Sequence, residues 1–285
     1  MNTRLVAVAA ILVLLVGSVA VTVPVHAGSG CSSSFSFDGT IMKLNADCST
    51  HATILIRDGF TLDGAGHTIT AVDPPRGHFL GAVVANEGKS ANVKNLKITA
   101  RNLIDICDSS APPDFRLRGI QFKGSSGEIT NNIVTDINQG ASSICKEGAG
   151  IEVRNEPTDG THPNTQTVEV SNNVVMNYQM VGIVAVGDVS VNIHHNRVSA
   201  SIAQATVPAS GIQLSYHAIG EISANVITGN WYQQGKAIGQ QPWVSAGILL
   251  YNIEMSNIKV FNNELSDNQF NMLVITSASL QWSYP

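Results

Sequence analysis

The sequence predicts an all-β fold, a single-stranded right-handed parallel β-helix (solenoid) of about seven coils. Three observations support this prediction. A short phrase centred on asparagine recurs along the chain, a second phrase beginning with glycine precedes it, and the spacing between the two is nearly constant. Both phrases alternate apolar and polar residues, as β-strands do. No repeat of this size can bury its own apolar face, so stacked repeats must share one core.

The asparagine phrase predicts a tight bend that recurs once per coil. Asparagine tolerates left-handed backbone and can hydrogen-bond to the same residue one coil away. The copies read VKNLKI (93–98), ITNNIV (129–134), VSNNVV (170–175), IHHNRV (193–198), ISANVI (222–227) and VFNNEL (260–265). Their alignment places one asparagine column at Asn95, Asn132, Asn173, Asn196, Asn225 and Asn263, with Gly66 in the same place one repeat earlier.

The glycine phrase predicts a second strand in each coil. Its copies start at Gly81, Gly119, Gly150, Gly182, Gly211 and Gly247, and five of the six lie 13 to 16 residues before the next asparagine of the column. Its alternation places one set of side chains in the core: Ile120, Phe122, Ile151, Val153, Ile212, Leu214, Ile248 and Leu250. A β-sandwich would need hairpin turns between neighbouring strands, and a leucine-rich repeat would need a regular leucine ladder; the repeats have neither.

The N-terminus predicts export. Arg4 precedes an apolar run that reaches about residue 23, and Val25-His26-Ala27 offers small residues for cleavage before Gly28. We therefore expect a signal peptide over 1–27, an N-terminal cap over about 28–51, coils over about 52–276 and a short C-terminal tail. A retained membrane anchor is the alternative, since about 20 apolar residues span a bilayer. Trp282 in the tail either covers the last coil, or that end pairs with another chain.

In its repeated asparagine phrases, the chain resembles the secreted right-handed parallel β-helix proteins of the pectate-lyase-like superfamily. FTLDGAGHTI (60–69) is similar to the opening coil of that group, and the resemblance covers roughly 54–275. It implies the fold and a carbohydrate-related role. The Asn-Thr-Asp, Asp-Asp, Gly-His-Gly and Arg-Ile-Lys signatures of polygalacturonases are absent, as is the Asp-Pro-His-Asp signature of alginate epimerases.

Four cysteines in an exported chain predict two disulfides. Cys107 follows Asn95 by 12 residues and Cys145 follows Asn132 by 13, so the two lie at nearly the same place in consecutive coils. We therefore expect Cys107–Cys145, which leaves Cys31–Cys48 to fasten the N-terminal segment.

Length variation is concentrated between each asparagine and the next glycine. We therefore expect long loops at roughly 100–118, 135–149, 199–210 and 229–246 along one edge of the solenoid, with a further insertion at 155–167. Aromatic residues in the last of these loops either bind sugar rings or cover the core: Trp231, Tyr232 and Trp243.

The outward side of the glycine-led strands carries the candidate site. A lyase that acts on an acidic sugar needs a base, a group that neutralises the enolate and an acid. Lys123 or Arg154 is a candidate base or neutraliser, and Tyr216 or His217 a candidate acid. Glu152 would serve a hydrolase together with Asp105, Asp108 or Glu147, or else form a solvated cross-coil ion pair with Arg154. Substrate contacts are expected from Gln121, Gln213, Trp231, Tyr232, Trp243 and Tyr251.

No metal site is predicted. His194 and His195 are neighbours on a strand, so their side chains should point to opposite faces and not share one ion. His67 follows a turn glycine and is expected to be structural. No cofactor is certain, and calcium is considered only for the loop 155–167, which contains Asp159.

These features favour a secreted carbohydrate-active protein whose partner is an acidic polysaccharide, with a lyase- or epimerase-like reaction as the leading hypothesis. The formal net charge of −5 argues against a nucleic-acid partner, and no membrane contact is expected after signal cleavage. A non-catalytic polysaccharide-binding or cell-surface structural protein is the alternative. A periplasmic accessory protein for metalloenzyme assembly is the third hypothesis.

Overall fold

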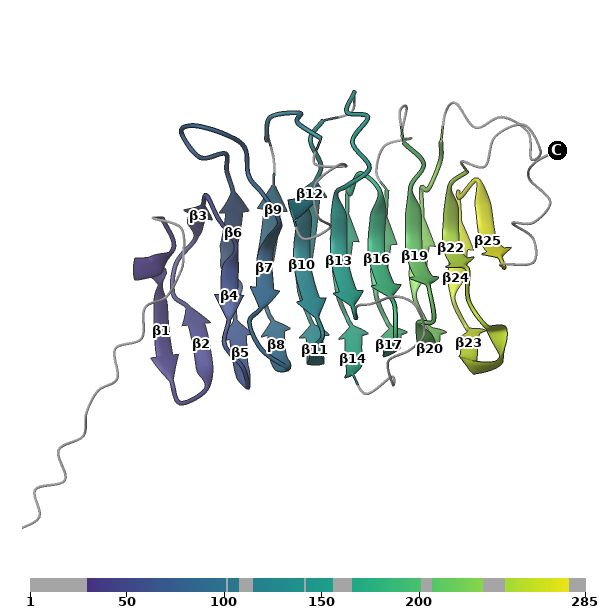
Figure 1. Ribbon diagram of the computed structural model, residues 1–285, viewed down its shortest axis with the longest axis horizontal. Helices are drawn as coiled ribbons and strands as arrows, with labels where there is room; N and C mark the ends of the chain where they lie inside the picture. The colour runs from purple at the N-terminus through teal and green to yellow at the C-terminus, as the bar shows by residue number, and fades with distance from the viewer. Residues whose placement is uncertain are drawn as a thin grey trace, which may run out of the picture.

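The strands of the chain wind into three sheets that run the length of the molecule (Figure 1). The computed structural model describes residues 30–100, 102–107, 115–140, 142–155, 166–200, 207–232 and 244–276. Within them, successive strands pass from one sheet to the next and then return one coil further along, so every pairing is parallel except that of β1 with β2. The predicted parallel β-helix is confirmed.

Sheet A contains the first strand of each coil. It consists of β1 (Phe35–Asp38), β2 (Ile41–Leu44), β5 (Phe60–Asp63), β8 (Ser90–Lys94), β11 (Ser126–Thr130), β14 (Gln166–Ser171), β17 (Val189–His194), β20 (Ile219–Ser223) and β23 (Ile258–Phe261). β1 folds back antiparallel on β2 at the N-terminal end, next to the short 3-10 helix η1 (Ser32–Ser34).

Sheets B and C complete each coil. Sheet B consists of β3 (Cys48–Thr50), β6 (Thr68–Ala71), β9 (Lys97–Ala100), β12 (Ile133–Ile137), β15 (Val174–Met176), β18 (Arg197–Ser199), β21 (Val226–Thr228) and β24 (Glu264–Ser266). Sheet C consists of β4 (Ile54–Ile56), β7 (Ala82–Asn86), β10 (Arg118–Lys123), β13 (Ala149–Arg154), β16 (Val181–Val186), β19 (Ser210–Ser215), β22 (Ala246–Tyr251) and β25 (Phe270–Ile275). A second 3-10 helix, η3 (Met255–Asn257), precedes β23.

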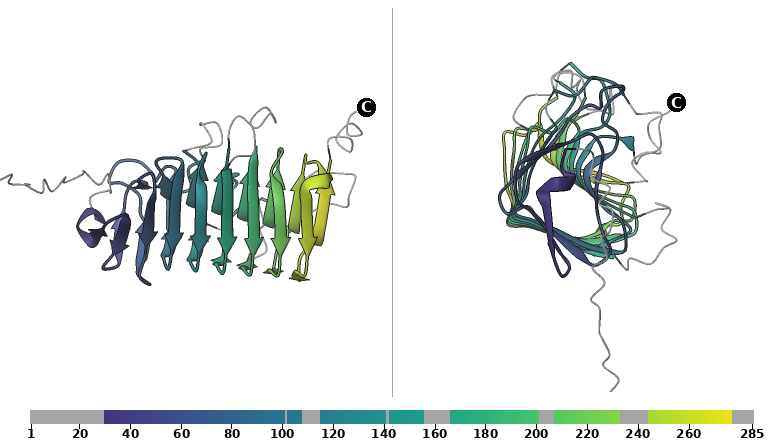
Figure 2. Two further views of the ribbon diagram at one scale, coloured as in Figure 1. Left: turned by 90° about the horizontal axis from the view of Figure 1, so that it is seen from below. Right: turned by 90° about the vertical axis from the view of Figure 1, so that its left-hand side faces the viewer.

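Eight coils are formed by the described residues, because sheets B and C each contain eight strands. The sequence predicted about seven, and the additional coil is β2–β4, which lies largely in the segment expected to be a cap. Seen along the long axis, the coils superimpose on one another (Figure 2). The connections from sheet B to sheet C therefore begin and end along one edge, where the length variation of the sequence falls.

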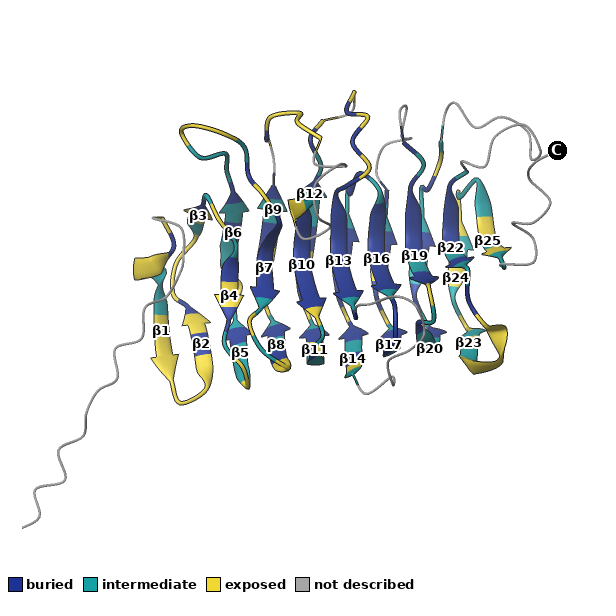
Figure 3. Ribbon diagram, viewed as in Figure 1, coloured by how far each residue is buried: buried dark blue, intermediate teal, exposed yellow. Residues whose placement is uncertain are grey.

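The core is built from in-register columns of aliphatic side chains. In sheet C, for example, Ile120, Ile151, Ile183, Ile212 and Ile248 are aligned in consecutive coils and are fully buried. The central strands of sheet C are buried along almost their whole length, whereas β1 and the last coil have more exposed residues (Figure 3). Burial of this aliphatic surface is the main stabilising contribution to the fold.

The asparagine column is a buried ladder in the turn from sheet A to sheet B. Asn173 donates from both its main-chain N–H and its Nδ2 to Oδ1 of Asn196, each at 3.0 Å, and Nδ2 also donates to the carbonyl of Ile129 at 2.8 Å. The same pattern runs from Asn132 to Asn263. The ladder thus satisfies main-chain groups that the turn would otherwise bury without partners.

Two details of this column were predicted wrongly. The residue in register with Asn132 is Leu96, whose N–H donates to Asn132 Oδ1 at 3.1 Å, so Asn95 lies one position too early. The left-handed backbone conformation is found at the residue before each ladder position and not at the ladder asparagine: φ is +53° at Asn95, +57° at Asn172 and +55° at His195.

The glycine column allows close approach of consecutive coils. A Cβ on Gly182 would lie 2.6 Å from the carbonyl oxygen of Gly211 and 2.4 Å from Cγ1 of Val198. Gly119, Gly150 and Gly211 are similarly crowded. Gly81 does not belong to this column. Ala82 is in register with Arg118, so the residue that corresponds to Gly119 is Val83. The alignment of the first glycine phrase was thus wrong by two residues.

Both predicted disulfides are present. Cys31 pairs with Cys48 and Cys107 with Cys145, with Cα–Cα distances of 5.2 and 4.9 Å. The second bond joins the sheet B to sheet C connections of two consecutive coils, as the spacing from the asparagine phrases predicted.

Candidate functional site

The strands of sheet C align the predicted site residues in two outward columns. Gln121, Glu152, Val184, Gln213 and Leu249 form one column. The next column lies two residues closer to the end of each strand and consists of Lys123, Arg154, Val186, Ser215 and Tyr251. Lys123, Glu152 and Arg154 therefore come together on two adjacent coils, as the alternation predicted.

Glu152 lies at the centre of a buried polar cluster. It is only 4% exposed, and its carboxylate accepts hydrogen bonds from Arg118 Nε at 2.8 Å and Gln121 Nε2 at 3.1 Å. Arg154 Nη1 lies 3.6 Å from the same carboxylate. The ion pair across coils is thus formed with Arg118, whereas Arg154 is on the same strand as Glu152.

This arrangement limits what the cluster can do. The expectation of a solvated ion pair is wrong, because the side chains of Arg118 and Glu152 are about 4 to 5% exposed. A carboxylate whose oxygens are engaged by two donors and that also faces a second guanidinium is not free to contact a substrate. Gln121 is likewise buried and donates its amide to Glu152. Arg118 was not identified from the sequence, although its place immediately before the glycine phrase was visible.

The candidate acids Tyr216 and His217 lie two coils from Arg154, at the turn that follows β19. At about 4.8 Å per coil this is a separation of about 10 Å along the axis. Both residues have positive φ, +50° and +73°. The Tyr216 ring packs edge-on against Tyr251, with centroids 5.5 Å apart. Partial burial, together with the neighbouring Tyr251, raises the pKa of Tyr216.

The remaining predicted contacts are spread over both edges of sheet C. Trp231, 48% exposed, and Tyr232 lie in the connection that leads into β22, whereas Tyr251 ends that strand. A six-residue strand separates the two edges by roughly 20 Å. Gln213 is half-buried between them and donates to Ser215 Oγ at 3.2 Å. Trp243, Asp108 and Asp159 lie outside the described residues.

The outer face of sheet B has a pocket that the sequence did not reveal. It encloses about 600 Å³ over three consecutive coils. Thr70, Thr99 and Thr135 are in register along its floor. Thr68, Val72, Asp73, Lys97, Asn102 and Ile133 contribute to its lining. The signal in the sequence was the threonine in the strands TIT, KIT and IVT, each of which follows a tight turn.

Asp73 and Thr99 define the chemistry of this pocket. The carboxylate of Asp73 accepts from the N–H groups of Phe79 and Ile104, at 2.8 and 2.7 Å, and so fixes the loops that border the pocket. Thr99 Oγ1 is buried without a hydrogen-bond partner. Lys97 is exposed and places a cation beside the threonine column. The lining thus offers hydroxyl groups, one amide, one ammonium group, the Asp73 carboxylate and three aliphatic side chains.

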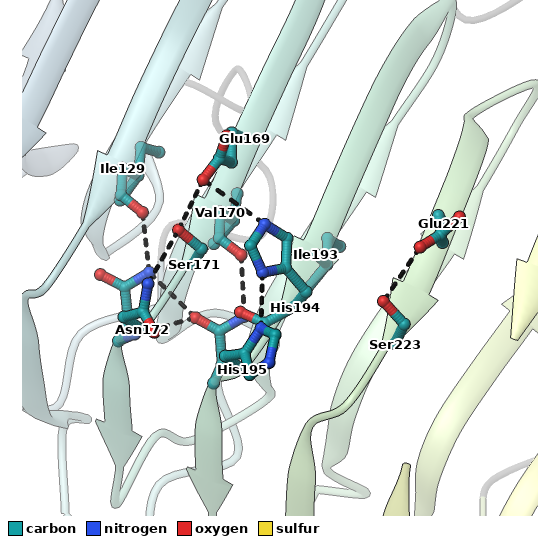
Figure 4. Close-up of polar contacts among 12 residues, drawn as sticks. Ile129, Glu169, Val170, Ser171, Asn172, Ile193, His194, His195, Glu221 and Ser223 are labelled. Carbon is teal, nitrogen blue, oxygen red and sulfur yellow. Dashed lines mark hydrogen bonds and ion pairs between the residues drawn. The ribbon is translucent and has the colours of Figure 1, made fainter. Parts of the chain in front are cut away.

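His194 and His195 do not follow strand alternation. The prediction that their side chains face opposite sides is wrong, because His195 adopts φ +55° directly after β17 ends at His194. The two Nδ1 atoms consequently lie 2.8 Å apart on the outer face of sheet A (Figure 4). His67, which was expected to be structural, lies 3.3 Å from Asp47.

One group of potential metal ligands among the described residues is misleading. Asp105, Cys107 and Cys145 have their ligand atoms close together, but the two sulfurs are bonded to each other in a disulfide. A disulfide sulfur is not the thiolate that binds metal ions. We therefore do not treat this group as a metal site.

Within the described residues, no helix is long and apolar enough to cross a membrane. The predicted signal peptide, 1–27, and Trp282 of the C-terminal tail lie outside those residues.

Comparison with known proteins assigns the fold family. No curated protein and no solved structure shows significant similarity to the chain. A family described as the right-handed β-helix region matches residues 80–281, which is more than two thirds of the sequence. This agrees with the three parallel sheets, the asparagine ladder and the in-register aliphatic core. The chain therefore belongs to the right-handed β-helix family.

Proposed function

We propose that this protein binds an acidic polysaccharide, and that the pocket on sheet B holds part of the polymer. The observation that carries the proposal is the in-register column of Thr70, Thr99 and Thr135 on the floor of a 600 Å³ pocket, with Lys97 beside it. Pockets of about 300 to 1,000 Å³ with a few convergent polar groups are typical of ligand sites.

The lining suits a sugar that carries carboxylates. Hydroxyl groups can both donate to and accept from sugar hydroxyls, and Thr68, Thr70 and Thr135 contribute such groups to the lining. Val72 and Ile133 offer apolar surface to the ring carbons. Lys97 provides a cation for a uronate carboxylate. The pocket extends over three coils, about 10 Å from first to last, so it accommodates a short stretch of a longer polymer.

Binding accounts for the geometry better than a lyase or epimerase reaction. Such a reaction requires base, neutraliser and acid around one sugar. On sheet C, Glu152 is occupied by Arg118 and Gln121, and Tyr216 is about 10 Å from Arg154 along the axis. In the sheet B pocket, Asp73 is bound by two main-chain N–H groups. The lyase hypothesis is therefore tested as an alternative outcome.

The test is affinity electrophoresis through gels that contain polygalacturonate, alginate or a neutral glucan. We expect retardation by an acidic polymer only. Lys97→Gln should raise the dissociation constant by roughly tenfold or more, because one charge-assisted hydrogen bond is lost. Thr99→Val should raise it by a smaller factor without weakening the fold, since Oγ1 has no partner in the protein.

Two matched controls lie in the same columns but outside the pocket. Arg197 is in the column of Lys97 and Thr228 in that of Thr99, both further along sheet B. Arg197→Gln and Thr228→Val should leave binding within about twofold. Equal losses in Lys97→Gln and Arg197→Gln, or no retardation by any acidic polymer, would refute binding in this pocket. An increase in absorbance from unsaturated uronate products would instead establish a lyase.

We also propose that the protein is exported. Two disulfides support this, because such bonds persist in oxidising compartments. Mass spectrometry of the protein recovered outside the cytoplasm should give an N-terminus at Gly28. A protein that retains residues 1–27, or that stays in the cytoplasm with reduced cysteines, would contradict export.

A further inference from the structure

The outer face of sheet A carries two imidazoles that converge on one point. His194 is the last residue of β17 and His195 the first residue of the following turn. Left-handed backbone at His195 turns its side chain to the same side as that of His194, and the two Nδ1 atoms lie 2.8 Å apart (Figure 4). The rings are nearly perpendicular, with centroids 5.1 Å apart.

Glu169, on the neighbouring coil, faces the Nε2 side of His194. Its Oε1 lies 3.4 Å from His194 Nε2 and accepts a hydrogen bond from Ser171 Oγ at 2.7 Å. A carboxylate oxygen can only accept, so this contact favours the tautomer of a neutral His194 with the proton on Nε2 and the lone pair on Nδ1. A carboxylate bound to the other ring nitrogen is the usual partner of a metal-binding histidine, because it orients the ring and raises its basicity.

The main chain beneath the two rings is held by the asparagine ladder. Asn196 Nδ2 donates to the carbonyl of His194 at 3.0 Å, and the N–H of Asn172 reaches the same oxygen at 3.3 Å. The His194 side chain remains 22% exposed, and His195 is exposed. The site is therefore fixed in position and accessible to an ion from solvent.

We propose that His194 Nδ1 and His195 Nδ1 chelate one divalent copper ion in place of the hydrogen bond that joins them, with the proton of His195 moving from Nδ1 to Nε2 and with water completing the coordination of the ion. Two bonds of about 2.0–2.1 Å from nitrogens 2.8 Å apart meet at about 90°, the angle between neighbouring ligands in tetragonal geometry. A tetrahedral zinc ion would need the nitrogens further apart. Nickel should bind more weakly than copper and more tightly than cobalt, following the usual order of divalent ions.

The test is isothermal titration of the intact, untagged protein with Cu²⁺, Ni²⁺ and Zn²⁺ after removal of bound metals by a chelator. We expect one copper per chain, with two nitrogen ligands in the electron paramagnetic resonance spectrum. Neighbouring coils suggest variants that keep the fold. On the preceding coil, Asn172 occupies the position that corresponds to His195, and Ser171 occupies the position that corresponds to His194. His195→Asn and His194→Ser should each weaken copper binding by at least about tenfold, because chelation by two imidazoles becomes coordination by one.

Two further variants separate this site from general surface binding. Glu169→Gln should weaken copper by about 10- to 100-fold while it leaves the two-nitrogen spectrum intact. His67→Gln removes another partly exposed imidazole and should change neither the copper affinity nor the resonance spectrum. Unaltered copper affinity in His195→Asn, or zinc binding as tight as copper, would overturn the proposal. Because the site is on sheet A and the sugar pocket on sheet B, loss of one activity need not affect the other.

Discussion

At the scale of single residues, each inner ladder asparagine joins several groups of neighbouring coils through one buried amide. Asn196 accepts from Asn173 through Oδ1 and donates from Nδ2 to Val170, His194 and Asn225. It is 1% exposed. Removal of its amide would leave several main-chain groups buried without partners, and each such group costs about 1–3 kcal/mol.

We therefore expect Asn196→Ala to lower the free energy of unfolding by about 3 kcal/mol or more, measured by urea denaturation. Asn192→Ala is the control, because Asn192 is exposed on the outer face of the same coil and should change stability by less than about 0.5 kcal/mol. Equal losses in the two variants would show that the ladder does not stabilise the turn.

Asp63 gives a pH-dependent contribution at the start of sheet A. Partial burial would raise its pKa, but the N–H of Ala65, the amide of Asn95 and the ammonium of Lys94 together hold the pKa below the ordinary 3.8. A pKa lowered by folding stabilises the protein above the unfolded value, and this contribution is lost as the pH falls through the folded value.

Asp63→Asn should accordingly be less stable than the parent at pH 7, by less than about 1 kcal/mol because its ionic partner Lys94 is 41% exposed and solvent screens the pair. The difference should shrink as the pH falls below 3.8 and disappear once the pH is below the lower pKa of the folded state, where the carboxyl is protonated in both folded and unfolded chains. Thermal melts of both proteins between neutral and acid pH measure this. A difference that is constant with pH would mean that charge is not its cause.

At the scale of elements, the glycine column sets how closely coils approach one another where sheet C begins. Gly182 has no positive φ, so its role is space and not backbone freedom. Gly66 is the opposite case: φ is +83°, and nothing lies within 4 Å of the place that a Cβ would occupy. The two glycines therefore differ in the reason why glycine is required.

Gly182→Ala should destabilise the protein by about 1–3 kcal/mol through overpacking against Gly211 and Val198. Gly66→Asn is the matched variant and should cost less than about 1 kcal/mol, because asparagine tolerates left-handed backbone and the space is open. Denaturant unfolding of both variants tests this. A larger loss of stability in Gly66→Asn than in Gly182→Ala would contradict the conclusion that space is limiting at Gly182 and not at Gly66.

At the scale of the whole molecule, stability should vary along the axis. Each coil contacts only its neighbours, so an inner coil is stabilised on two sides. The burial pattern agrees: five of the six residues of β13 are buried, whereas no residue of β25 is. Phe261, Met272 and Val274 of the last coil remain exposed.

Amide hydrogen exchange followed by mass spectrometry should therefore be slowest in β10, β13 and β16 and fastest in β24 and β25. Fragments that contain the ladder residues Asn173 and Asn196 should be among the most protected. Uniform protection from one end to the other would contradict a stability gradient and favour all-or-none unfolding.

Prediction from sequence succeeded where one position repeats in every coil. The inward columns, the ladder from Asn132 and the Cys107–Cys145 disulfide follow from spacing alone, and Cys31–Cys48 is the pair that then remains. It failed at Asn95 and Gly81, where a repeat departs from the common phrase and only the pairing of strands fixes the register. It failed again at His195, because strand alternation does not extend into a left-handed turn.

The sequence by itself determined the parallel β-helix, its core and the edge with long loops, because those depend on residue periodicity and turn chemistry. Only the tertiary structure decided which outward side chains meet and which are buried. Glu152 is bound by Arg118, four threonines line one pocket and the Nδ1 atoms of two histidines meet, since each contact joins residues from different coils or depends on a local φ. Such contacts depend on register between coils, and a difference of one residue moves a side chain to the other face of the sheet.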